Sequence, residues 1–384
     1  MKISNLCLYL MKCSINSQKP GLLPSFEMKE LWRYANRHSV SVAVAKTLLD
    51  NNLFGDESWK LRWQELLQKN IRKTMLFNAE RAKVEGQLDS LGVWHVPLKG
   101  IIVNQLYPGF GLRQFADNDI LVGDGHKEKI RKMMHSIGYN DLVSFETDDS
   151  FKKKPMLNME IHYKLFKEKK NYEVFNDYYK DVFSRLIPDG RSPYSYKFTD
   201  EDFYVYFLAH AYRHFREAGI GIRLFADVFV YRKSIKMDDA YVYGELEKLK
   251  ILGFGKIIES ISDKVFSPDE SFDEAALTNE ELPVFESIIN TNTYGSFEQL
   301  SENRYNDYVS ESGKTSKSGY YFRRLFPSME DHKDAHPFIY RHKILYPAFY
   351  IYRPFRGLVK NRDGLSKEIK TIRQVEKKNT HNKK

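Results

Sequence analysis

The chain has few cysteines and no apolar run long enough to cross a membrane. Cys7 and Cys13 are the only cysteines among 384 residues. A bridge between them is open, but two cysteines in so long a chain fit free thiols in a reducing compartment. No stretch reaches the roughly 20 apolar residues that a transmembrane helix needs. The opening MKISNLCLYLMKC stops being apolar at Lys12 and lacks a cleavage site, so we expect a cytoplasmic protein rather than a secreted one.

Positive charge is scarce outside the end of the chain. The net charge is +9, yet residues 353–384 hold 11 Lys and Arg against three acids and so carry +8 of it. The remaining sequence is nearly neutral. A nucleic-acid-binding protein would carry basic residues along its folded body, so this distribution disfavours nucleic acid as a partner. The basic tail leaves peripheral contact with a membrane surface open.

No internal repeat is present, and the spacing of apolar residues indicates the fold class. Across 26–90 apolar residues recur every three or four positions, which predicts helices. Short apolar runs then predict strands over 115–122 and 157–163, with a helix over 126–138 between them. Helical spacing resumes at Asp200. The sequence therefore predicts an α+β protein.

The length suggests two or three domains. Composition and spacing predict five regions: an N-terminal helical region, 1–90; a central region of strands and helices, 91–195; a helical region packing on it, 196–265; a mixed and helical region, 266–360; and a basic mobile tail, 361–384. The aromatic and basic segment 344–360 allows two interpretations. It is either a peripheral membrane helix or a helix that closes on the body, which its mixed faces favour.

Two aspartates stand two positions apart at the head of an apolar run. Asp117 and Asp119 lead into Ile120-Leu121-Val122, and strand side chains alternate, so both carboxylates point to one face. The two acids repel each other and lose hydration if partly buried, a cost that a divalent cation removes. Carboxylates suit Mg²⁺, which completes its shell with water and phosphate. The plainer alternative is a turn with solvated carboxylates.

A third acid fits the same picture. Residues 157–163 read LNMEIHY, which alternates apolar residues with Glu160 and His162 on the opposite face. Asp117, Asp119 and Glu160 could then gather around one or two metal ions. His162 either orients Glu160 or titrates near neutral pH and assists proton transfer.

Cations precede the paired acids. In Lys99-Gly100, the glycine lets the backbone approach a phosphate and the lysine supplies a point charge. Arg113 lies four residues before Asp117. It is either a loop arginine paired with one of the acids or a clamp on a triphosphate, and the second interpretation is favoured.

The order of these pieces resembles the DNA polymerase beta-like nucleotidyltransferase superfamily: Lys-Gly, then Arg, then Asp-x-Asp entering a strand, then Glu-x-His on a later strand. With the Leu-Tyr-Pro at 106–108, HAYRHFREAGIGIRLFADV at 210–228 and LFPSMED at 325–331, the chain resembles in detail the bacterial family of uncharacterised nucleotidyltransferases. Three positions depart from the superfamily pattern. Lys99-Gly100-Ile101 lacks a hydroxyl, Asn118 separates the paired acids, and Glu160 stands where many relatives have Asp.

The resemblance implies a polymerase-beta-like palm, a small mixed sheet with helices, flanked by helical regions. It implies Mg²⁺-dependent transfer of a nucleoside monophosphate from an NTP such as ATP to an acceptor hydroxyl, on a small molecule, a glycan precursor or a protein. Two Mg²⁺ ions are expected, with Mn²⁺ as a substitute. The implied metal ligands and catalytic residues are Asp117, Asp119 and Glu160, and the implied phosphate ligands are Lys99, Gly100 and Arg113. The alternatives are a non-catalytic nucleotide- or partner-binding module on the same fold and a membrane-surface scaffold.

Two pairs on predicted helices complete the candidates. His210 and His214 are four apart and share a face, but no third ligand is placed to complete a zinc site, so structural roles are favoured. A supporting role beside the palm is open for both. Arg223 and Asp227 are also four apart. They form either a helix salt bridge or part of the pocket lining, since arginine suits phosphate.

Overall fold

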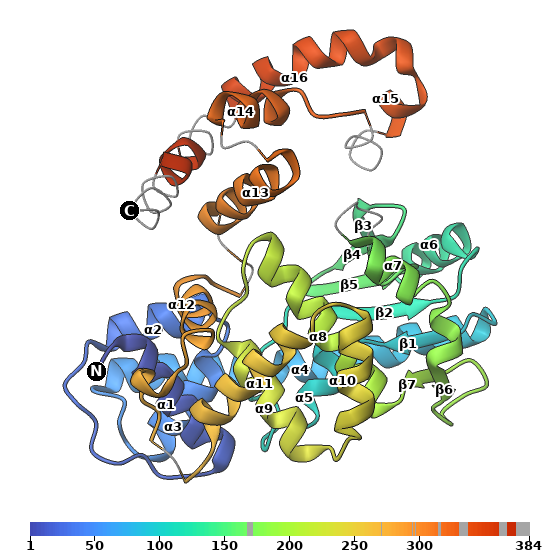
Figure 1. Ribbon diagram of the computed structural model, residues 1–384. Coiled ribbons are helices and arrows are strands. Elements are labelled where there is room, and N and C mark those ends of the chain that lie inside the picture. Colours follow the sequence, from blue (N-terminus) through green and yellow to red (C-terminus); the bar gives the residue numbers. More distant parts are fainter. Residues whose placement is uncertain are drawn as a thin grey trace. The chain divides into compact units, whose positions relative to one another are not determined.

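The computed structural model divides into two compact units (Figure 1). It describes residues 1–166, 172–269, 271–293, 295, 297–313, 316–329, 337–360 and 367–373. The N-terminal unit comprises Met1–Tyr212 and Gly221–Thr293, and the C-terminal unit comprises Arg213–Ile220 and Tyr294–Lys384.

The N-terminal unit is built around a five-stranded sheet in the order β1-β2-β5-β4-β3. Its strands are β1 (His95–Pro97), β2 (Asn118–Val122), β3 (Asn140–Ser144), β4 (Asp148–Lys153) and β5 (Leu157–His162). β2 and β5 are parallel neighbours at the centre, and the other pairs are antiparallel. The α+β prediction is confirmed, and both predicted strands form with slightly shorter bounds.

Helices cover the apolar face of this sheet. The strand residues that point to this face alternate with polar ones, as period two requires. Together with residues of α4 (Glu57–Ser90) and α6 (Lys127–Ser136) they form one buried cluster. Its main members are Phe77, Val84, Leu88, Ile120, Val122, Ile130, Met134, Phe151, Met159 and Ile161. The alternation that predicted the strands therefore also fixes which face is left for polar chemistry.

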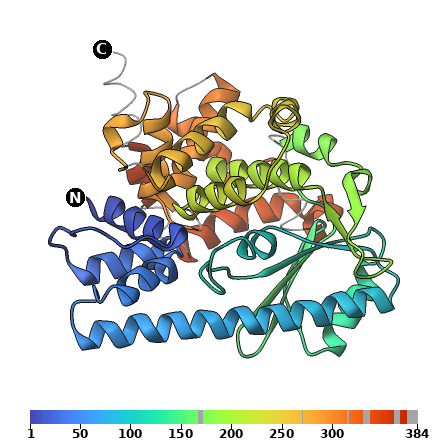
Figure 2. The ribbon, with the colours of Figure 1, turned by 90° about the horizontal axis from the view of Figure 1, so that it is seen from below.

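The helix α4 runs beside the sheet and beyond it (Figure 2). Its 34 residues make a rod of about 51 Å at roughly 1.5 Å per residue. Asp56 caps its start, with Oδ1 accepting from the Trp59 backbone N–H at 2.9 Å. Near this end Trp63 packs against Trp32 with ring centroids 4.6 Å apart. The helix therefore joins the N-terminal helices to the sheet.

Further helices and a small two-stranded sheet complete the N-terminal unit. They are α1 (Ile3–Asn16), α2 (Met28–Arg37), α3 (Ser41–Asp50), α5 (Gly100–Asn104), α7 (Glu173–Tyr178), η2 (Val182–Arg185), β6 (Leu186–Pro188), β7 (Tyr196–Phe198), α8 (Asp200–Glu217), α9 (Arg223–Ser234), α10 (Asp239–Lys248), α11 (Leu252–Phe266), η3 (Glu274–Ala276) and α12 (Glu281–Asn290). α8 ends in the C-terminal unit. The opening segment folds as α1, which packs on α3 and α11 and buries both free cysteines.

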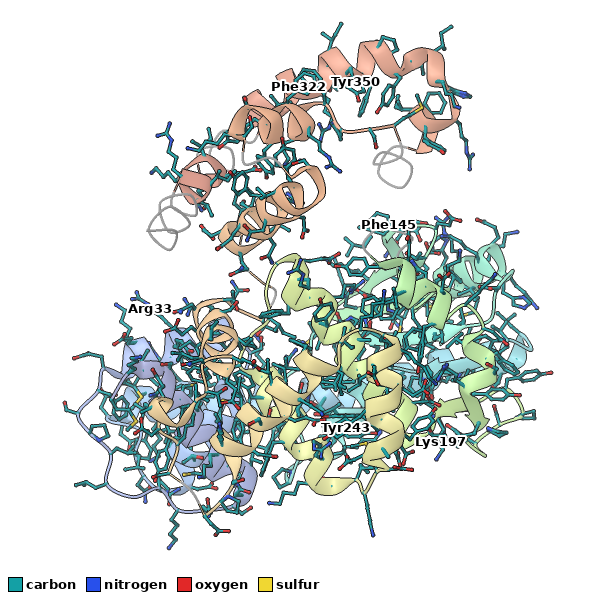
Figure 3. The ribbon with its side chains drawn as sticks, in the orientation of Figure 1. Arg33, Phe145, Lys197, Tyr243, Phe322 and Tyr350 are labelled. Carbon is teal, nitrogen blue, oxygen red and sulfur yellow. The ribbon has the colours of Figure 1, made fainter. Side chains whose placement is uncertain are left out.

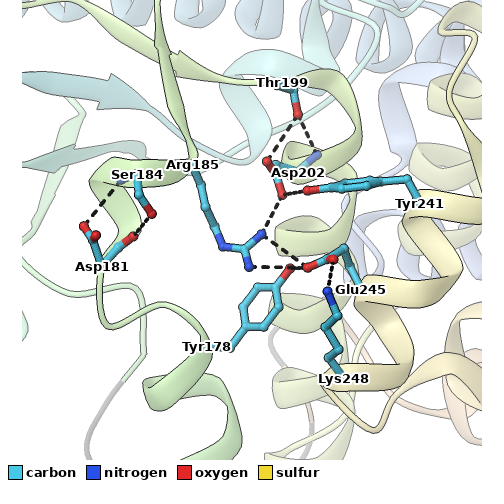
Figure 4. A network of polar contacts seen from close by, with 9 residues as sticks. All are labelled: Tyr178, Asp181, Ser184, Arg185, Thr199, Asp202, Tyr241, Glu245 and Lys248. Atoms are coloured by element: carbon cyan, nitrogen blue, oxygen red, sulfur yellow. Dashed lines mark hydrogen bonds and ion pairs between the residues drawn. The ribbon is translucent and has the colours of Figure 1, made fainter.

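A polar network fixes the chain that follows the sheet (Figure 4). The Arg185 guanidinium binds Asp202 of α8 at 3.0 Å and Glu245 of α10 at 3.3 Å, and it lies 3.9 Å from the Tyr178 ring centroid. Thr199 caps α8, since its hydroxyl accepts from the Asp202 backbone N–H at 3.1 Å. One arginine thus ties η2 to two helices through two buried carboxylates.

The C-terminal unit is helical in its described parts. It contains α13 (Phe297–Ser312), α14 (Lys317–Leu325), α15 (Pro337–Arg341), η5 (Lys343–Leu345) and α16 (Tyr346–Lys360). Figure 3 labels Phe322 on α14 and Tyr350 on α16. The ring of Tyr350 stacks on Phe326 at 5.7 Å. α16 therefore has a packed side within its own unit.

Part of the predicted mobile tail also packs there. Residues 367–373 are helical, and Ile372 is fully buried with Tyr305 and Tyr320. Glu368, one turn earlier, accepts from the Tyr320 hydroxyl at 2.7 Å. The charge of this segment predicts a mobile tail. Ile372 nevertheless packs against Tyr305 and Tyr320, and Glu368, four residues earlier, binds the Tyr320 hydroxyl. The other residues of 361–384 lie outside the described part of the chain.

None of the helices in the described ranges combines the length and apolarity required to cross a bilayer.

Candidate active site

The parallel pairing of β2 with β5 brings the candidate acids together. Asp119 stands opposite Glu160 in the register, and Ile120 stands opposite Ile161. The two isoleucines are buried against the helices. Strand alternation therefore directs Asp119, Glu160 and His162 to the other face of the sheet.

Two donors bind the same oxygen of Asp119. Lys99 Nζ donates to Oδ1 at 2.7 Å, and His162 Nε2 lies 2.9 Å from the same atom. Neither contact uses Oδ2. His162 Nε2 is also 3.7 Å from Glu160 Oε2, so the imidazole bridges the two acids and lies closer to Asp119 than to the Glu160 that the sequence suggested.

These side chains form a potential metal site. One ligand atom each from Asp119, Glu160 and His162 lies within 4.8 Å of the other two. Two carboxylates and an imidazole are a donor set that divalent ions accept. This group contains His162 and does not contain Asp117, which stays a predicted ligand.

Burial and neighbouring charges shift the pKa values of this cluster in different directions. Burial raises the pKa of Glu160, and the Asp119 charge adds to this, so the pKa reaches about 8. Burial would also raise the pKa of Asp119, but Lys99 and His162 outweigh it and hold that pKa below its usual value. Burial lowers the pKa of His162. One carboxylate is thus kept ionised while its neighbour is pushed towards the neutral form.

Asp117 lies directly before β2, outside the three-residue group. Burial and then the charge of Asp119 raise its pKa to about 6. Lys99, Arg223 and Lys73 act on it in the opposite direction. The charge of Asp119 therefore adds to the rise in the pKa of Asp117, while the three cations limit that rise.

The backbone at Lys99 and Gly100 is tightly constrained. Lys99 has φ 52° and ψ −118°, a conformation that costs a non-glycine residue free energy. A Cβ at Gly100 would lie 2.7 Å from Arg113 Nη1. The glycine is needed because an arginine occupies the space that a side chain would take.

Arg113 is buried under this turn and is held by Asp227. Its Nε and Nη2 donate to the two oxygens of Asp227 at 2.7 and 2.8 Å, and Nη1 reaches Gly100 O at 3.5 Å. The Tyr107 hydroxyl also donates to Asp227, at 2.8 Å. Arg113 therefore supports the turn from behind, and its partner is Asp227 rather than Asp117 or Asp119.

Lys73 is a residue that the sequence did not indicate. Its Nζ donates to Phe115 O at 2.7 Å. Arg223 Nη1 donates to Gln114 O, also at 2.7 Å, while its Nε is 3.9 Å from Asp227. The helical spacing around Lys73 predicts only that it is half-buried on α4. No local pattern indicates that Asp117 lies near it.

Asn118, which departs from the superfamily pattern, has a structural role. Its side chain is buried on the α4 side, where Nδ2 donates to Phe77 O at 3.1 Å. The polar residue thus satisfies a helix carbonyl behind the strand, so the acid-bearing face keeps its alternation.

The family model described as uncharacterised nucleotidyltransferase matches residues 24–256. The chain belongs to this family. No curated protein and no solved structure matches the chain. The match covers every candidate residue of the site and ends within α11.

The two histidines of α8 are not members of the group that could hold a metal ion in this member of the nucleotidyltransferase family. Among the described residues, the group that could hold an ion contains neither His210 nor His214. His210 faces the Tyr206 ring at 6.1 Å, and His214 Nε2 is 3.3 Å from Arg213 Nη2. These contacts fit the structural interpretation.

Proposed function

We propose that the protein transfers a nucleoside monophosphate from an NTP, ATP among them, to an acceptor hydroxyl, with Mg²⁺ or Mn²⁺ as cofactor. The observation that carries this proposal is the convergence of Asp119, Glu160 and His162 within 4.8 Å, in a chain that belongs to a nucleotidyltransferase family.

The residues fit a divalent cofactor. Asp119 and Glu160 would hold it, with Asp117 beside them. Burial and then the charge of Asp119 raise the pKa of Glu160, and a bound cation would offset both effects. A pair of bound ions would supply charge stabilisation at the attacking and leaving oxygens.

In the proposed reaction the acceptor oxygen forms a bond to the α-phosphorus, the bond from that phosphorus to the bridging oxygen breaks, and pyrophosphate leaves. The acceptor proton would pass to a carboxylate oxygen of Glu160, which stands opposite Asp119 in the paired strands. His162 holds Asp119 in place through Oδ1.

Lys99 and Gly100 serve the phosphates in this proposal. Lys99 Nζ, 2.7 Å from Asp119, lies where a phosphate bound to the cofactor would meet it. Gly100 keeps the turn free of a side chain. We assign Arg113 a positioning role in place of the expected clamp, since Asp227 occupies its guanidinium.

The test compares Asp119→Asn and Glu160→Gln with the parent. Asp119→Asn should abolish Mg²⁺-dependent NTP binding. Glu160→Gln should keep NTP affinity within about five-fold but remove nearly all pyrophosphate release, because its contribution lies in the transition state. Exposed Asp124, just beyond β2, gives the matched control Asp124→Asn, which should behave like the parent.

Pyrophosphate release would be measured over a pool of small hydroxyl compounds, glycan precursors and proteins. Equal release by the parent and Glu160→Gln would disprove the catalytic role of Glu160. NTP binding by the parent without release for any acceptor would favour the non-catalytic nucleotide-binding alternative.

A further inference from the structure

Two cations from distant parts of the chain bind consecutive carbonyl oxygens just before Asp117. Lys73 of α4 donates to Phe115 O, and Arg223 of α9 donates to Gln114 O, each at 2.7 Å. Their charged groups are therefore held beside the segment that leads into the paired acids.

The other two cations of the site are bound to carboxylates more closely than Arg223, whose Nε lies 3.9 Å from Asp227 Oδ2. Lys99 binds Asp119, and Arg113 binds Asp227 through two hydrogen bonds. Arg113 cannot turn to a triphosphate without leaving the buried Asp227 uncompensated, which is costly, and Lys99 is a single charge. A polyphosphate at this site needs other partners.

Lys73 lacks such a commitment within the part of the chain that the structure describes. Its contacts there are the neutral carbonyl of Phe115 and the ring of Phe77, 4.9 Å from Nζ, and it makes no ion pair with a described residue. A half-buried cation that makes no ion pair has lost hydration, and the charge of Asp117 offsets this loss only in part. Burial accordingly lowers the pKa of Lys73. An anionic ligand would supply the missing interaction.

We propose that Lys73 and Arg223 form the subsite that binds the β- and γ-phosphates of the nucleoside triphosphate, on the Asp117 side of the acids. The inference rests on the proposed function and extends it. A planar guanidinium and an ammonium group are complementary to phosphate oxygens. The segment Lys99-Gly100-Ile101 has no hydroxyl that could donate to a phosphate, and this subsite supplies donors in its place.

The charge balance agrees with this subsite. The acids Asp117, Asp119, Glu160 and Asp227 lie among the cations Lys73, Lys99, Arg113 and Arg223, and Asp148 adds a further negative charge near Glu160. Two Mg²⁺ ions would add four positive charges, and a fully ionised triphosphate carries four negative charges. The ions and the triphosphate therefore cancel each other's charge at this site.

The experiment measures Kd for Mg²⁺·ATP and for AMP by calorimetry in the parent, Lys73→Met and Arg223→Gln. Loss of one charge-assisted contact should weaken ATP about ten-fold or more in each variant while AMP changes less than about three-fold. Lys83→Met removes the same charge from an exposed position of α4 and should leave both values unchanged. Lys73→Arg should restore most of the ATP affinity. Inorganic tripolyphosphate should displace ATP from the parent.

Mn²⁺ affinity without nucleotide separates binding from a merely structural role. Removing a cation beside Asp117 should leave Mn²⁺ binding unchanged or tighter. A parallel loss of Mn²⁺, ATP and AMP binding would overturn the subsite, as would unchanged ATP affinity. A parent that binds no nucleoside triphosphate would overturn the proposed function together with the subsite.

Discussion

Arg113 and Asp227 form a buried two-point ion pair although 114 residues separate them in the chain. The pair joins the segment before Asp117 to α9. Because Arg113 Nη1 also lies against Gly100, the same pair holds the turn that carries Lys99. A long-range contact thus connects the Lys99-Gly100 turn to the helix that carries Arg223.

Asp227→Asn should destabilise the protein strongly. It leaves the buried Arg113 guanidinium without its counter-charge, and breaking a buried pair typically costs about 3–5 kcal/mol. The free energy of unfolding, from urea denaturation, gives the measurement. Asp124→Asn, at an exposed position, is the control. A loss below about 1 kcal/mol would show that the pair is solvated in solution.

Gly100→Ala should weaken Mg²⁺·ATP binding about ten-fold or more. The added Cβ would meet Arg113 Nη1 at 2.7 Å, and that side chain cannot yield without straining its bonds to Asp227. Gly86→Ala is the matched control, since nothing lies within 4 Å of a Cβ on that part of α4. It should leave binding unchanged and slightly raise the melting temperature. Equal ATP affinities in the two variants would contradict the argument.

The metal-free protein should lose stability as the pH rises from about 6.5 to 8. Glu160 has a pKa of about 8 in the folded state against an ordinary value of 4.5, so the folded state holds a proton that the unfolded state has released. Stability then falls with pH, by at most about 1.4 kcal/mol per pH unit. Burial lowers the pKa of His162 and of His38, so these two groups change the stability at pH values below this window.

Thermal unfolding in chelator across this pH range gives the measurement. Glu160→Gln should remove the decline, and Mg²⁺ should restore stability to the parent at pH 8. A decline of equal slope in Glu160→Gln would assign the titration to another group.

Ile372→Ala should loosen the C-terminal unit. Ile372 is fully buried with Tyr305 and Tyr320, and truncation of a buried isoleucine costs about 2–5 kcal/mol. Hydrogen exchange of α13 and α14 should speed up while the sheet of the N-terminal unit stays protected. Exposed Lys370→Ala is the control. Unchanged exchange would place the 367–373 helix outside the stable core.

Local spacing predicted the acid-bearing strands because alternation is a property of consecutive residues. It placed Glu160 and His162 on one face of β5 and the apolar residues on the other, as observed. The sequence did not predict the β3–β4 hairpin. β3 is exposed along its length and β4 reads DDSFKK, so neither strand shows a regular alternation of apolar and polar residues.

Contacts between distant segments could not be read in the same way. Arg113 looked like a phosphate clamp because the sequence shows a cation near two acids and does not show Asp227 folding behind it. Lys73 was missed for the converse reason. Its helix is evident, but the passage of that helix beside residues 114–117 depends on how α4 packs on the sheet.

The helix α4 belongs to two cores at once. Trp63 packs among the N-terminal helices, while Phe77 and Leu88 form part of the wall against the sheet. Residue 90 ends a helix, but a fragment that begins after it would lack the α4 residues that cover the sheet. The apolar face of the sheet would then be exposed to water. Dissection of the protein into fragments for labelling or crystallisation must therefore keep α4 whole, from its cap at Asp56 onward.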